Sequence, residues 1–228
     1  MFQSILNRIR EFPTKIILSF PENKKMLQNS RDVVEKYNIQ KWFTKIPAQR
    51  AYHQKITQFI AQNFKSDSTI LESGCGIGQT FCILARYGFK NFIGVEVDHN
   101  TFLGAKEFLM RQNVEAQLYE CDGLDVLKFQ PEDTVDIYLP LNWTYFTSQF
   151  DKVFEIGRKV LKSNGIMIVD FIRNDYVPKT EKEKKVYNNY PYKYSLNDVK
   201  VYYQSNKFEI IDIDESDDVR VVFYLRLK

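Results

Sequence analysis

Residues 70–78 read I-L-E-S-G-C-G-I-G and place three glycines at alternate positions, two residues beyond an acid. The chain has only nine glycines in 228 residues, so three within five positions need a physical reason. Glycine loses more backbone entropy on folding than any other residue, and it is used where a ligand approaches bare backbone. The stretch therefore predicts a ligand-binding loop between a strand and a helix.

The residues around these glycines indicate the charge of the ligand. A dinucleotide-binding loop has the pattern G-x-G-x-x-G, but the third position after Gly76 is Gln79. Glu72 precedes the glycines, and a carboxylate at that place disfavours a pyrophosphate. The pattern favours a ligand that carries positive charge.

Two further acids follow at the ends of expected strands. Glu96 lies in G-V-E-V-D, where a carboxylate can accept both hydrogen bonds from a ribose diol. Asp122 lies in C-D-G after the third expected strand, and Asp125 is its rival for the ligand contact expected at that place. An ordinary helix N-cap is the alternative for either of these two, and Asp98 is expected to cap a helix.

These landmarks, with the turn L-K-S-N-G at 161–165, resemble the class I S-adenosylmethionine-dependent methyltransferases over about residues 66–228. The resemblance implies S-adenosylmethionine as cofactor, with its cationic methionine end held by the acid-and-glycine loop. It makes Glu96 the ribose ligand, and it lets Asp122 accept from the adenine amine while the next backbone N–H reaches the ring. The cofactor-binding residues expected on this basis are Glu72, Ser73, Gly74, Cys75, Gly76, Gly78, Glu96, Val97, Asp122, Gly123, Leu139 and Pro140.

From residue 69 onward, short apolar runs alternate with amphipathic stretches of helical length, which predicts a parallel sheet with crossover helices. The last two runs are separated by a polar turn and predict an antiparallel hairpin. The expected fold is α/β, doubly wound, with a mostly parallel seven-stranded sheet and that C-terminal hairpin. The expected strands are 69–71, 91–96, 116–120, 134–139, 166–172, 208–213 and 219–227.

Residues 1–65 show no strand alternation and are expected to form a helical lid or extension beside a cofactor-binding domain at 66–228. Helices are expected in this extension at 4–12, 32–43 and 49–64. In the second domain, Ser195 and Asp198 have capping-box spacing at a helix start.

Methyl transfer from a sulfonium needs orientation and desolvation more than a base, so the catalytic residue is the least visible part of the sequence. The resemblance places the end of the fourth strand beside the transferring methyl, and 140–143 read P-L-N-W there. This is not the Pro-Pro motif of enzymes that methylate base amino groups, which argues against that activity. The catalytic candidates are His53, Tyr52, Asn142 and Asp170, none assigned as a base, and a surface position is the simpler interpretation of His53.

The residues expected to line an acceptor site are Asn142, Trp143, Tyr145 and Arg173, although simple packing is an equal alternative for Trp143. Residues 1–65 carry twelve Lys and Arg against four Asp and Glu, a net charge of +8, and the rest of the chain is −5. This basic segment motivates an anionic small molecule as the acceptor. The first alternative is an RNA- or protein-directed methyltransferase that docks through this basic segment, and the lysines and tyrosines of 179–194 could also bind nucleic acid, which ranks second as a partner. A noncatalytic cofactor-binding subunit is the other alternative.

Three cysteines without metal-binding spacing predict a reduced cytoplasmic protein that holds no metal ion. No apolar run approaches the ~18–20 residues that cross a bilayer, so no membrane span is expected. The sequence contains nothing that specifies an oligomeric state.

Overall fold

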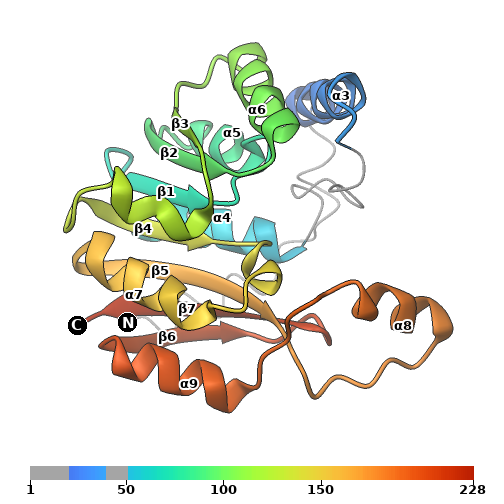
Figure 1. Cartoon of the computed structure of the whole chain (residues 1–228). Coiled ribbons are helices and arrows are strands. Elements are labelled where there is room, and N and C mark those ends of the chain that lie inside the picture. Colours follow the sequence, from blue (N-terminus) through green and yellow to red (C-terminus); the bar gives the residue numbers. More distant parts are fainter. Residues whose placement is uncertain (1–20, 40–50) are drawn as a thin grey trace.

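The computed structural model describes residues 21–39 and 51–228, and its centre is one seven-stranded sheet (Figure 1). The strand order is β3-β2-β1-β4-β5-β7-β6. The strands β1 to β5 run parallel to one another, whereas β7 runs antiparallel to both β5 and β6. This confirms the expected fold class. The strands are β1 Thr69–Ser73, β2 Asn91–Glu96, β3 Gln117–Glu120, β4 Val135–Pro140, β5 Leu161–Ile172, β6 Phe208–Asp214 and β7 Arg220–Leu227.

Helices cover both faces of the sheet. Successive strand residues point to opposite faces, and on each face they pack in a separate hydrophobic cluster. Ile70 packs in one cluster and Leu71 in the other, and Ile137 and Tyr138 divide in the same way. The helices are α3 Pro21–Lys36, α4 Ala51–Asn63, α5 Gln79–Ala85, α6 His99–Arg111, α7 Phe150–Val160, α8 Glu181–Asn188 and α9 Leu196–Ser205, with short 3-10 turns η3 Gly123–Lys128 and η4 Thr144–Phe146.

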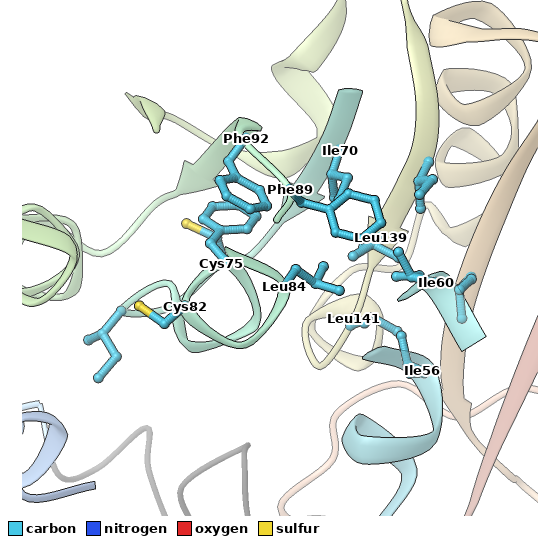
Figure 2. Close-up of a cluster of buried hydrophobic side chains, with 14 of the residues drawn as sticks. Ile56, Ile60, Ile70, Cys75, Cys82, Leu84, Phe89, Phe92, Leu139 and Leu141 are labelled. Carbon is cyan, nitrogen blue, oxygen red and sulfur yellow. The ribbon is translucent and has the colours of Figure 1, made fainter. Parts of the chain in front are cut away.

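The helix α4 belongs to the same core as the sheet. Its Ile56 and Ile60 are fully buried and lie in one cluster with Leu139 and Leu141 from β4 and its end (Figure 2). Phe59 packs on Tyr224 of β7, with ring centroids 4.8 Å apart. This helix, which the sequence analysis assigned to the extension, therefore helps to build the sheet's core. The division of the chain at residue 65 stays a prediction.

The helix α3 joins the α6 side of the fold. Its Ser30 accepts a 2.7 Å hydrogen bond from Gln79, and both side chains are buried. Tyr37, just after the helix, donates to Glu107 of α6 at 2.7 Å. Gln79, the residue that breaks the dinucleotide pattern, thus anchors α3 to the first turn of α5.

Several boundaries differ from the expected ones. The helix expected at 32–43 begins earlier, at Pro21, where a proline fits the first helical turn, and it ends at Lys36. The turn expected at 162–165 lies inside β5, which bulges so that Leu161 pairs with Val135 and Ile166 with Ile137. The helix α8 was not among the expected elements, and it begins with a capping box of Thr180 and Glu183. The helix expected at 4–12 and residues 40–43 lie outside the described residues.

Other local predictions are confirmed. Ser195 and Asp198 form the capping box of α9, and β6 and β7 form the C-terminal hairpin. In the described residues, no helix is long and apolar enough to span a membrane.

We expect Ile60→Ala to lower the free energy of unfolding by about 2–5 kcal/mol, because the change leaves a cavity where α4 meets the sheet. Val201→Ala on α9 is the control, since that side chain is 61% exposed and its loss should cost less than about 0.5 kcal/mol. Urea unfolding of both variants measures the difference. Equal, small losses would show that α4 is not part of the core.

Candidate functional site

The backbone conformation of the loop at residues 74–78 explains why it contains three glycines. Gly74, Gly76 and Gly78 have φ values of 71°, 56° and 81°, in the left-handed region that disfavours side chains. The N–H groups of Gly74 and Cys75 both donate to the carbonyl of Val95 in β2, at 2.8 and 2.9 Å. The loop is therefore tied to the neighbouring strand before α5 begins.

Glu72 is a buried carboxylate at the end of β1, only 3% exposed. Its Oε1 accepts a hydrogen bond from Thr80 at 3.0 Å, while its Oε2 is buried and has no hydrogen-bond partner among the described residues. Burial raises the pKa of Glu72 to about 8; the Thr80 hydrogen bond opposes this rise, and the nearby charge of Glu96 adds to it. A buried acceptor without a donor is costly, so this oxygen marks a place for a cationic or hydrogen-bonding ligand.

Glu96 ends β2, next to the loop. Its Oε2 accepts from the Gly76 N–H at 3.1 Å, and its Oε1 accepts from the Asp98 N–H at 2.9 Å. Burial raises its pKa, and these two backbone hydrogen bonds lower it in part. Each oxygen keeps a second lone pair, so the carboxylate is fixed in place and can still accept from a diol.

The third acid has a capping role in the structure. Asp122 is exposed, and its side chain accepts from the Leu124 N–H at 2.9 Å as the N-cap of η3. This is the alternative that the sequence left open, and contact of Asp122 with an adenine stays a prediction. Asp98 caps α6 through Thr101, as expected.

Trp143 lies against two glycines of the expected cofactor site. A Cβ atom added to Gly74 would lie 2.7 Å from Trp143 Cδ1, and one added to Gly123 would lie 2.9 Å from Cζ2. The indole therefore reaches from the glycine loop to the start of η3. Its Nε1 is buried without a hydrogen-bond partner in the described part of the chain. Trp143 was expected beside the acceptor or in packing, and the structure places it along the cofactor motif.

The structure brings three of the four catalytic candidates together. Asp170 is fully buried near the end of β5, and its Oδ1 accepts from the Asn142 backbone N–H at 2.8 Å. Asn142 Nδ2 lies 2.9 Å from Nε2 of His53, which α4 supplies. His53 is only 2% exposed, so the surface interpretation of this residue was wrong. This interpretation was wrong because α4, which carries His53, packs in the core. The side chain of Tyr52 lies outside the described residues.

Arg220, which sequence reasoning missed, completes this group. It opens β7, is 5% exposed and forms an ion pair with Asp170. Its Nη1 lies 3.3 Å from Asn142 Oδ1, and its guanidinium carbon lies 5.4 Å from the ring centre of Tyr145. An arginine directly before the apolar run 221–225 was the available sign, but the sequence could not show that Asp170 would face it.

The remaining candidates have separate surroundings. Arg173 pairs with Asp175 at 2.8 Å and with Glu215 at 3.5 Å, so its contact with an acceptor stays a prediction. Ser73 pairs with Pro140 in the β1–β4 register, which brings the ends of these strands together. Leu139 is buried in the core beside them, whereas Val97 is 67% exposed.

Comparisons with known proteins agree with this geometry. Residues 71–169 match the family model described as "Methyltransferase domain". The chain is 26% identical over 165 residues to EEF1A lysine methyltransferase 2 of Danio rerio, covering 64% of this chain and 63% of that protein. It spans less than two thirds of the length of the curated relatives it matches.

Solved structures share the fold. A SAM-dependent methyltransferase from Aquifex aeolicus superposes with a TM-score of 0.58 at 14% identity, over 81% of this chain and all of that one. Geranyl diphosphate C-methyltransferase from Streptomyces coelicolor A3(2), in complex with S-adenosyl-L-homocysteine, gives a TM-score of 0.62 at 12% identity, over 77% and 79% of the two chains. The chain therefore contains a region similar to a methyltransferase domain and shares its fold with S-adenosylmethionine-dependent methyltransferases.

The residues present fit the cofactor of this family. The buried Oε2 of Glu72 lacks the donor that an ammonium group would supply, and Glu96 has lone pairs for a diol. Among the described residues, no group of three or more His, Cys, Asp and Glu could hold a metal ion.

The raised pKa of Glu72 predicts a pH-dependent cost in stability. Between the ordinary value of 4.5 and about 8, the unfolded chain loses this proton while the folded chain keeps it. The folded state then binds more protons, so stability falls as pH rises across this window. We expect Glu72→Gln, measured without ligand, to become progressively more stable than wild type over this range, by up to ~1.4 kcal/mol per pH unit.

Urea unfolding at a series of pH values checks this. Glu132→Gln, at an exposed position before β4, is the control and should run parallel to wild type. Parallel curves for Glu72→Gln and wild type would show that Glu72 ionises freely in the folded protein.

Proposed function

We propose that the chain is an S-adenosylmethionine-dependent methyltransferase that transfers the methyl group to an oxygen or nitrogen atom of a small molecule. The observation that carries the activity is the buried, unpartnered Oε2 of Glu72 behind the glycine loop. A degenerate subunit that binds no cofactor would have no need to retain so costly a group together with Glu96 and Asp122.

In this proposal three acids hold the cofactor. Glu72 binds the ammonium group, Glu96 accepts from the ribose hydroxyls, and Asp122 accepts from the adenine amine. The cofactor supplies an already activated methyl group, so the protein contributes orientation and exclusion of water. Trp143, packed along Gly74 and Gly123, would cover the cofactor on the side of β4.

The burial of the polar group next to β4 supports a small acceptor. His53, Asp170 and Arg220 are each at most 5% exposed, and Asn142 joins them. An acceptor that reaches these groups must enter the fold, which a folded macromolecule cannot do. The solved neighbour that acts on geranyl diphosphate shows that this fold accommodates a small anionic acceptor in another protein.

A protein-directed activity is the second candidate. The relative from Danio rerio is named a lysine methyltransferase, and a lysine side chain is slender enough to reach a buried site. The lysine-rich helix α8 extends from the body of the fold, where a protein substrate could dock on it (Figure 1). An RNA acceptor would dock through the basic residues 1–65, whose net charge is +8.

A reducing compartment such as the cytoplasm fits the cysteines. Cys75, Cys82 and Cys121 are all free thiols, and the first two are buried.

Transfer of labelled methyl groups tests the proposal directly. The full chain is incubated with radiolabelled S-adenosylmethionine and with separate metabolite, RNA and protein fractions. We expect label in the metabolite fraction, and a loss of about tenfold or more with Glu96→Ala, which removes two charge-assisted hydrogen bonds to the cofactor.

Glu120→Ala is the matched control, because Glu120 ends β3 beside Glu96 but is exposed and contacts His99. It should retain wild-type incorporation. Label in protein or RNA alone would replace the small-molecule acceptor by the second candidate, and no label in any fraction would contradict the activity.

A further inference from the structure

Two buried charges fix the orientation of the Asn142 side chain. Asp170 accepts from the backbone N–H of Asn142 and pairs with Arg220. A guanidinium has donors only, and Nη1 of Arg220 lies 3.3 Å from Asn142 Oδ1. The amide oxygen of Asn142 must therefore face Arg220.

This orientation decides the protonation of His53. The amide NH2 of Asn142 lies 2.9 Å from Nε2 of His53, and an NH2 group can only donate. Nε2 must then offer its lone pair, so the proton of the neutral ring sits on Nδ1. A doubly protonated ring would bring two donors face to face.

We propose that Arg220 is a positioning residue that, through Asn142, holds His53 as the neutral tautomer protonated on Nδ1. In this state Nε2 cannot take a proton from an acceptor, whereas Nδ1 is a hydrogen-bond donor. At the acceptor site His53 acts as a donor and not as a general base.

The tautomer narrows the class of acceptor. A general base is needed when the reacting atom holds its proton tightly, as an alcohol does. A histidine that only donates suits an acceptor whose lone pair is available without it, such as a neutral amine or a carboxylate. This step rests on the proposed function, whereas the tautomer does not.

Nitrogen NMR of histidine-labelled protein tests the tautomer without any substrate. The chain has two histidines, and His99→Gln assigns the signals of His53. We expect the wild-type spectrum to show Nδ1 protonated and Nε2 unprotonated. In Asn142→Asp, the side chain facing His53 can only accept, so a proton should appear on Nε2. Aspartate also tolerates the positive φ of 64° at this position.

Variants of Arg220 test its positioning role. Arg220→Lys keeps a donor-only partner and should retain the wild-type tautomer, whereas Arg220→Gln lets the Asn142 amide turn over and should lose the single tautomer. The exposed His99 is the internal control, and its signals should not change.

Three results would overturn the proposal: a proton on Nε2 in wild type, an unchanged tautomer in Asn142→Asp, or a single wild-type tautomer in Arg220→Gln. If Arg220→Gln does not fold, Asn142→Asp decides alone, because it leaves the buried pair of Asp170 and Arg220 in place. A wild-type chain that shows the expected tautomer but transfers no methyl group to any fraction would contradict the proposed function and leave the tautomer proposal standing.

Discussion

A carboxylate buried without a partner for one of its oxygens is the constraint on which the site depends. Glu72 ends the central strand β1, where a hydrogen bond from Thr80 satisfies only one side. Such a group destabilises the folded protein, and binding of a cation would offset part of this unfavourable free energy. The left-handed glycines then let the loop turn tightly beside this carboxyl group, and Glu96 is held next to it by the loop's own backbone.

The helices of the N-terminal region make the site a part of the core. The helix α4 buries Ile56 and Ile60 against the sheet and carries His53 to the end of β4. The helix α3 is tied to α5 through Ser30 and Gln79. Helices that are packed in this way also fix polar groups, and the link from Arg220 through Asn142 to His53 is one result. Specificity for the acceptor would then be set by hydrogen-bond direction as much as by shape.

Sequence patterns predicted correctly the features that depend on interactions between residues close together in the chain. Short apolar runs alternate with amphipathic stretches along the chain, and this pattern predicted the strands and helices of the sheet. The capping box of α9 lies within four residues. The glycine loop with Glu72 and Glu96 indicated the cofactor. These patterns did not predict the features that depend on contacts between residues far apart in the chain. The burial of His53 depends on how α4 packs, and Arg220 meets Asp170 only because β7 runs antiparallel to β5. Asp122 has a local cap that a sequence motif cannot distinguish from a ligand contact.

The central claim is that Glu72 is the carboxylate that receives the cationic end of the cofactor. Calorimetry of S-adenosylmethionine binding at about pH 6.5, in two buffers of different ionisation enthalpy, tests it most directly. Because Glu72 is protonated in the free protein and must ionise beside an ammonium group, binding should release close to one proton. Glu72→Gln should bind more weakly and release none. Equal binding enthalpies in both buffers for wild type, or unchanged proton release in the variant, would contradict the account.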